Sequence, residues 1–87
     1  MKNENKYRQI FCKRLKEARV TKGLSQKQLG IVAGIDEFVA STRINRYEKG
    51  IYEPDIETAG RLAEALDIPL AYLYADDGLA EIIKCSS

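Results

Sequence analysis

The stretch from Ser25 to Gly50 constrains the fold of this 87-residue chain more than any other. Ser25 and Gln28 form the S-x-x-Q pattern of a capping box, which satisfies two backbone donors at the start of a helix. We therefore expect a helix to begin at Gln26. Gly34 is expected to end it, because the residue after a helix often needs a positive φ, which glycine adopts without steric cost.

The expected helix has a face suited to close packing. Leu29 and Ala33 are four residues apart and therefore lie on one side. Gly30 has no side chain beyond a hydrogen, so another helix can cross there at short distance. After the turn, Ile35 is expected to return the chain to the core.

A second helix is indicated by Ala40, Ile44 and Tyr47, which are spaced by four and three and share a face. The other faces carry side chains that can all donate hydrogen bonds and include no acid: Ser41, Thr42, Arg43, Asn45 and Arg46. Such donors suit phosphate oxygens and the major-groove edge of guanine.

This arrangement resembles the lambda-repressor-like helix-turn-helix family, also called the Cro or Xre type. The resemblance rests on Arg19, on GLSQKQLG from Gly23 to Gly30, on the turn AGI, and on INRYEKG from Ile44 to Gly50. It covers roughly residues 10–74 and implies an all-α domain with five helices that is a sequence-specific transcriptional regulator. The chain length indicates that residues 1–87 form a single domain. Its partner would be double-stranded DNA, read in the major groove by the second motif helix. Such proteins usually bind palindromic operators as homodimers.

The spacing departs from the family after the turn. Gly34 and Ile44 are ten positions apart, more than the family usually has. Without an insertion, Arg43 would fall on a buried position, where an unpaired charge is costly. We interpret residues 36–39 as an insertion that forms a loop or an extra turn, so the start of the second helix stays open. Asp36 and Glu37 are expected to cap that helix or to point away from phosphates.

The residues suggest individual roles in binding DNA. The helix N-terminus at Gln26, with its side-chain amide, is expected to anchor a phosphate. Base reading is expected from Ser41, Thr42 and Arg46, with the Thr42 methyl meeting thymine and Arg46 pairing with guanine. One of the two arginines is expected to meet only phosphate or solvent, and Asn45 can point away. The predicted set is Gln26, Ser41, Thr42, Arg43, Asn45, Arg46 and Lys49.

Three further roles concern the ends of the motif. The resemblance implies that Arg19 forms a structural ion pair with Glu48, and that Lys49 contacts the DNA backbone. For Tyr52 two interpretations stay open: its hydroxyl meets a phosphate, or its ring covers the core.

The remaining helices follow from apolar spacing. Phe11, Leu15 and Ala18 predict a helix from about Tyr7 to Lys22. Pro54 and Asp55 introduce another, and Pro69 introduces a fifth. The first of these two is expected to be a core helix, because its apolar residues are spaced by three, four and three: Ile56, Ala59, Ala63 and Leu66. The second offers a short apolar edge of Leu70, Leu73 and Tyr74.

A possible short sixth helix carries an apolar stripe of Leu79, Ile82 and Ile83. It is too short to be stable alone, so it either caps its own domain or pairs with a second copy.

Composition narrows the function. The chain has no histidine, and its two cysteines, Cys12 and Cys85, form neither a disulfide framework nor a metal site. We therefore expect that the protein is not an enzyme and that it binds neither a cofactor nor a metal. No evident feature binds a small molecule. No apolar run is long enough for a membrane span, and the N-terminus lacks a signal-peptide core. We expect a cytoplasmic protein that associates with the nucleoid when bound.

The charge is divided along the chain. Residues 1–22 carry eight Lys or Arg and two Glu, a net +6, whereas residues 51–87 carry two basic and eight acidic residues, a net −6. The basic end can face phosphates, although its lysines are equally well explained as a solvated helix face. The acidic half motivates an alternative function, a protein-interaction module such as an antitoxin or a phage-encoded inhibitor.

Overall fold

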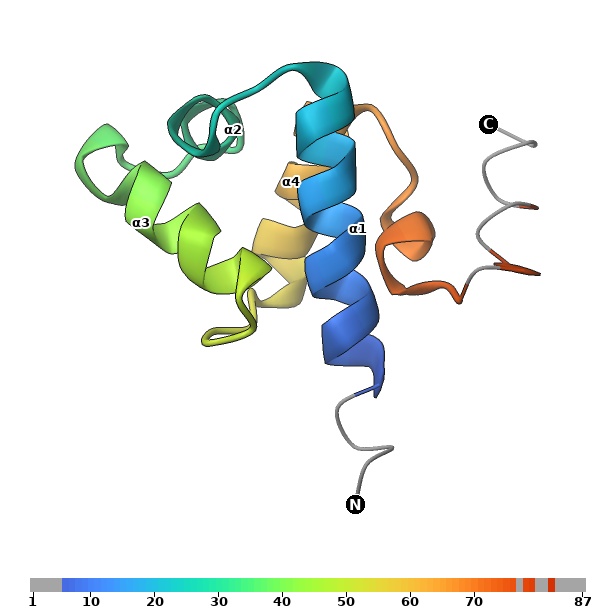
Figure 1. Cartoon of the computed structure of the whole chain (residues 1–87). Coiled ribbons are helices and arrows are strands. Elements are labelled where there is room, and N and C mark those ends of the chain that lie inside the picture. Colours follow the sequence, from blue (N-terminus) through green and yellow to red (C-terminus); the bar gives the residue numbers. More distant parts are fainter. Residues whose placement is uncertain (1–5, 77, 80–81, 83–87) are drawn as a thin grey trace.

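The computed structural model describes residues 6–76, 78–79 and 82. In these residues the chain forms four α-helices, one 3-10 helix and no strand (Figure 1). The elements are α1 (Lys6–Lys22), α2 (Gln26–Val32), α3 (Glu37–Glu48), α4 (Ile56–Leu66) and the 3-10 helix η2 (Leu70–Tyr74). The all-α class is confirmed.

The count of five α-helices is not supported. The segment after Pro69 forms the short 3-10 helix η2, for which Pro69 supplies no side-chain cap, and Ala75 is already extended. The predicted sixth helix falls mostly on residues outside the described ranges.

The start and the end of α2 are as the sequence predicts. The backbone N–H of Gln28 donates to Ser25 Oγ at 3.0 Å, and the backbone N–H of Ser25 donates to Gln28 Oε1 at 2.8 Å. These two bonds complete the capping box. After α2, Gly34 has a φ of +91°. The turn between α2 and α3 therefore uses the conformational freedom for which glycine is needed.

The helix α3 crosses α2 at the predicted glycine. A Cβ atom built on Gly30 would lie 2.6 Å from the Cβ atom of Ala40 and 3.1 Å from its Cα atom. Ala40 itself is fully buried. The close crossing expected from the sequence is confirmed.

Residues 36–39 are the N-cap and the start of the first turn of α3, and not a loop. Asp36 is the N-cap of α3, and its side chain accepts a hydrogen bond from the backbone N–H of Phe38 at 2.8 Å. Since α3 begins at Glu37, Ala40 already lies inside the helix. Asp36 thus caps α3, one of the two positions expected for it.

The core is built from all the helices. Its most buried side chains come from α1 (Phe11, Leu15), α2 (Leu29, Ala33), α3 (Ala40, Ile44, Tyr47), α4 (Ala59, Leu62, Ala63, Leu66) and η2 (Leu73). The prediction that Ile56 belongs to this core is wrong, since its side chain is 72% exposed. The buried stripe of α4 is centred between Ala59 and Leu62, which leaves Ile56 at its edge in the first turn.

The η2 segment is held against α1. The rings of Phe11 and Tyr74 stack with centroids 5.2 Å apart. The buried Arg14 lies over the ring of Tyr72, 5.1 Å from its centroid, and its Nη2 donates to the carbonyl of Ala75 at 3.4 Å. These contacts place η2 on the other side of α1 from α3 (Figure 1).

Candidate nucleic-acid interface

The exposed surface of α3 consists of the polar residues that the sequence singles out. Ala40, Ile44 and Tyr47 are buried, whereas Ser41, Thr42, Arg43 and Arg46 are exposed and Asn45 is half-buried. The structure thus brings five of the predicted contact residues onto one helix. Within the described part of the chain, no element covers the four exposed side chains.

Arg46 is held by Tyr52 from the loop after α3. Its Nη1 donates to the Tyr52 hydroxyl at 2.9 Å, and its guanidinium carbon lies 5.3 Å from the centroid of the tyrosine ring. Tyr52 is 47% exposed, so the interpretation that it covers the core is wrong. The hydroxyl and the ring face of Tyr52 together orient the guanidinium of Arg46.

Glu48 links three helices at the end of α3. Arg19 donates from Nε to Glu48 Oε2 at 2.6 Å and from Nη2 to Oε1 at 3.2 Å. Both side chains are nearly buried, with 13% and 4% exposed. Gln26 Nε2 also donates to Glu48 Oε1, at 3.1 Å. The carboxylate therefore joins α1 and the start of α2 to α3.

Gln26 is consequently already engaged. One N–H of its half-buried side-chain amide donates to Glu48. A side-chain amide has two N–H donors, so a second is left for a ligand at the start of α2. Lys49 follows Glu48 directly and is exposed.

An open hollow with basic walls, hereafter the basic hollow, lies between α1 and the end of α3. It is lined by Arg8, Gln9, Cys12, Lys13, Lys16, Glu48, Lys49 and Gly50. The sequence analysis named none of these α1 side chains as a contact. From the net +6 of residues 1–22 it left open whether this end of the chain faces phosphates or solvent.

The Cys12 thiol lines the basic hollow and is itself hydrogen-bonded. Cys12 Sγ donates to the carbonyl of Tyr47 at 3.2 Å. Burial is the main cause that raises the pKa of the Cys12 thiol above its ordinary 9.0. The thiol therefore stays protonated at neutral pH and ties α1 to the last turn of α3.

A family model described as helix-turn-helix matches residues 15–73, more than half of the chain. The chain belongs to the Xre-like helix-turn-helix family of transcriptional regulators. The match spans α1 from Leu15 onward, α2, α3, α4 and η2 up to Leu73, so it contains the whole exposed surface of α3.

Two relatives of this helix-turn-helix domain are informative. The chain is 32% identical over 69 residues to the cryptic phage CTXphi transcriptional repressor RstR of Vibrio cholerae, which covers 77% of the chain. The chain spans only 57% of that repressor's length. The crystal structure of the transcriptional regulator BswR is similar with a TM-score of 0.80 and 51% identity, over 87% of the chain and 77% of BswR.

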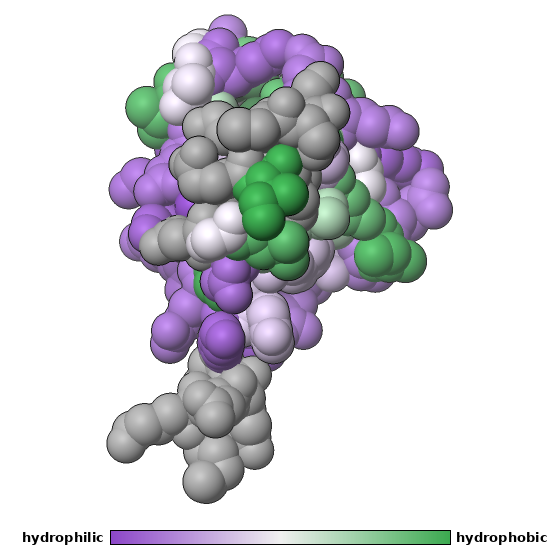
Figure 2. All heavy atoms as spheres, turned by 90° about the vertical axis from the view of Figure 1, so that its right-hand side faces the viewer, coloured by the Kyte–Doolittle hydropathy of each residue, from purple (hydrophilic) through white to green (hydrophobic). Residues whose placement is uncertain are grey.

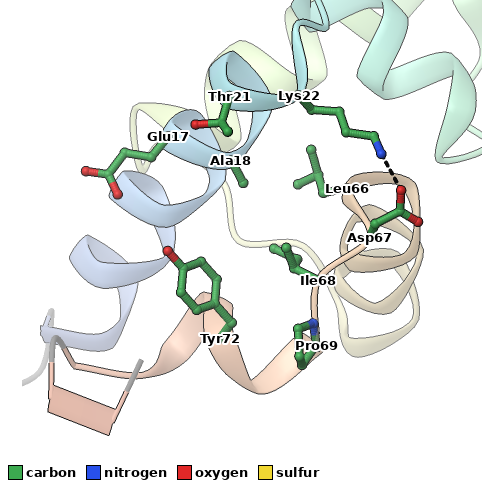
Figure 3. Close-up of a pocket in the computed structure, with 9 residues that line it drawn as sticks. All are labelled: Glu17, Ala18, Thr21, Lys22, Leu66, Asp67, Ile68, Pro69 and Tyr72. Atoms are coloured by element: carbon green, nitrogen blue, oxygen red, sulfur yellow. Dashed lines mark hydrogen bonds and ion pairs between the residues drawn. The ribbon is translucent and has the colours of Figure 1, made fainter. Parts of the chain in front are cut away.

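The helix-turn-helix domain has a second hollow on the side of α1 that faces η2 (Figure 3). Its walls include the apolar side chains of Ala18, Leu66, Ile68 and Pro69, and an ion pair between Lys22 and Asp67 lies at its rim. Because α3 lies on the other side of α1, this hollow is separate from the surface described above.

The same side of the domain carries the start of the C-terminal segment. Hydrophobic side chains gather near the centre of this face, within a mostly hydrophilic surface (Figure 2). Leu79 and Ile82 are 51% and 66% exposed. Ile83, the third residue of the predicted stripe, lies outside the described residues, as does Cys85.

The described residues show neither a cluster of metal ligands nor a helix that could cross a membrane. Residues 6–76, 78–79 and 82 contain no group of three or more His, Cys, Asp or Glu side chains that could hold a metal ion. In the same part of the helix-turn-helix chain, none of the helices combines the length and the apolar character that a membrane crossing requires.

Proposed function

We propose that this protein is a sequence-specific transcriptional regulator that reads the major groove of double-stranded DNA with α3. The observation that carries the proposal is the division of α3 into a buried apolar face and a face of solvated hydrogen-bond donors. The major groove is wide enough to admit one α-helix. The repressor and the regulator to which the chain is similar support the same function.

Base reading is assigned to Ser41, Thr42 and Arg46. The hydroxyls can bond to either kind of base edge, and the Thr42 methyl suits the 5-methyl of thymine. Arg46 is exposed and already oriented by Tyr52, so its fork can meet O6 and N7 of guanine. Arg43 and Asn45 complete the predicted groove contacts, and one of the two arginines is expected to reach only phosphate.

Phosphate contacts are assigned to two places beside α3. Lys49, with Lys13 and Lys16 of the basic hollow, supplies positive charge at the end of α3. The second N–H of Gln26 offers a donor near the start of α2. Such contacts fix the orientation of a protein on the duplex and carry no sequence information themselves.

The protein is further proposed to act as a homodimer on a palindromic operator, in the cytoplasm and at the nucleoid. Half-sites of such operators lie about one helical turn apart. The exposed Leu79 and Ile82 are candidate contacts between the two copies. Sedimentation as a monomer at high micromolar concentration, with and without operator, would contradict this assembly.

The experiment that tests the function is selection of bound sequences from a random duplex pool. A defined motif is expected, together with affinity that falls steeply with salt. Arg46→Ala is expected to relax the preference at one guanine. Weak retention without sequence preference would instead favour the interaction module with an acidic C-terminal half, an alternative that the comparisons do not favour.

A further inference from the structure

Phe38 is the most exposed large hydrophobic side chain in the described part of the chain, at 89%. Single exposed hydrophobic residues are common on protein surfaces, so exposure alone indicates no function. The position of this ring is what distinguishes it. It lies in the first turn of α3, one residue after the helix begins at Glu37.

Phe38 stands on the outward stripe of α3. At 100° per residue, Phe38, Thr42, Asn45 and Lys49 follow one another along the side opposite the buried Ala40, Ile44 and Tyr47. Three of these four residues belong to the predicted DNA contacts. A helix rises 1.5 Å per residue, so Phe38 lies about 6 Å beyond Thr42 along the axis.

The first turn of α3 is held in place at its start. The Asp36 side chain accepts the backbone N–H of Phe38 at 2.8 Å, which is the N-cap bond of the helix. This bond fixes the backbone from which the ring projects. The ring is therefore presented on a capped helix and not on a frayed end.

The charges around Phe38 argue against a phosphate as its neighbour. Asp36 and Glu37 precede it directly, and the first turn contains no basic residue. Carboxylates are repelled by the DNA backbone, whereas an aromatic ring has no affinity for phosphate. In the major groove, the 5-methyl of thymine is the apolar group on a base edge.

We propose that Phe38 is a further specificity-determining residue, which packs its ring against the 5-methyl of a thymine in the major groove. The inference rests on the function proposed above. The first turn of α3 would then belong to the surface that reads DNA and would add an apolar contact to the polar ones.

The test replaces each thymine of the selected operator by deoxyuridine, which removes the methyl and keeps base pairing. The wild type is expected to lose affinity about three- to ten-fold at one or two positions. Phe38→Ala is expected to bind the unmodified operator more weakly by a similar factor, and to bind thymine and uracil equally well at those positions.

The control is Ile56→Ala, which removes another well-exposed apolar side chain, outside α3. It is expected to keep the wild-type discrimination. Thermal unfolding of both variants should match the wild type, because neither side chain is buried.

The outcomes separate this inference from the proposed function. If the wild type selects no sequence at all, both fail. If it selects an operator but Phe38→Ala distinguishes thymine from uracil as the wild type does, the assignment of Phe38 is overturned and the function stands. If Phe38→Ala binds DNA as the wild type does but sediments differently, the Phe38 ring belongs to a protein interface, which also overturns the assignment.

Discussion

The Cβ atom of Ala40 occupies the space that a side chain on Gly30 would need. A Cβ on Gly30 would approach it to 2.6 Å, and would lie 3.1 Å from the Ala40 carbonyl oxygen. Real Cβ contacts are not this short. The distance between α2 and α3 is therefore set by the contact between the Cα hydrogen of Gly30 and the methyl group of Ala40.

Gly30→Ala is expected to lower the free energy of unfolding by about 1–3 kcal/mol, because the two helices must move apart. Equilibrium unfolding in urea measures this change. Gly60→Ala is the matched control: a Cβ there meets nothing within 4 Å and lies inside α4. It is expected to raise stability by up to about 1 kcal/mol. A Gly30→Ala variant as stable as the wild type would contradict the close crossing.

Breaking the pair of Arg19 and Glu48 should be among the most destabilising changes outside the core. Arg19→Met is expected to cost about 3–5 kcal/mol, since it leaves the nearly buried Glu48 carboxylate without its cation. The double variant Arg19→Met with Glu48→Gln should cost less than the sum of the two single changes. Additive costs in denaturant unfolding would show that the pair is not coupled.

Tyr52 should affect DNA binding through Arg46. Arg46→Ala is expected to weaken operator binding by about 1–3 kcal/mol and to relax the preference at one base pair. Tyr52→Phe removes the hydroxyl that accepts from Arg46 and keeps the ring, so a smaller loss at the same base pair is expected. Tyr52→Leu removes both contacts and should lose more. Competition binding with operators altered at single positions measures each effect; an equal loss on all sequences would refute the link.

The lysines of the basic hollow should contribute to the salt dependence of DNA affinity. Lys13→Gln and Lys16→Gln are each expected to reduce the slope of log affinity against log salt by about 1, with equal loss on all sequences. Lys22→Gln is the matched control, because Lys22 pairs with Asp67 at the other hollow. A slope unchanged by the first two substitutions would remove α1 from the interface.

The N-cap of α4 should make stability depend on pH. Hydrogen bonds from the side chain and the backbone N–H of Thr58 lower the pKa of Asp55 below its ordinary 3.8. A lowered folded pKa gives a contribution that is present above pH 3.8 and is lost as the pH falls through the folded value.

Asp55→Ala should therefore lower the Tm at neutral pH, and its difference from the wild type should shrink in acid. Asp55→Asn keeps the acceptor without the ionisation and should lose this pH dependence. Thermal unfolding followed by circular dichroism across this pH range tests both variants. A constant difference between Asp55→Ala and the wild type would contradict the role of the charge.

Local chemistry made much of this fold predictable. The capping box of Ser25 and Gln28, the glycine turn at Gly34 and the buried spacing of Ile44 and Tyr47 each depend on a few adjacent residues. Their consequences are therefore visible in the sequence, and the structure contains all of them. The pair of Arg19 and Glu48 came instead from a resemblance, since nothing local indicates it.

Features that depend on tertiary packing were missed. Periodicity alone placed Ile56 in the core and overlooked Leu62, because the stripe of α4 is rotated relative to that pattern. The burial of Arg14 depends on η2 folding back over α1. The contact between Tyr52 and Arg46 depends on the path of a loop, which hydrophobic spacing does not specify.

Glu48 has a consequence for how this protein could change its target. A single carboxylate joins α3 to both preceding helices, so these bonds would have to break before α3 could pivot independently to suit a different operator. New specificity would have to arise by exchanging the solvated side chains of α3 one at a time, on a scaffold whose angle stays constant. The orientation of α3 would stay constant while its exposed side chains change. A library of variants at positions 38, 41, 42 and 46 is therefore the way to select for binding to a different DNA sequence.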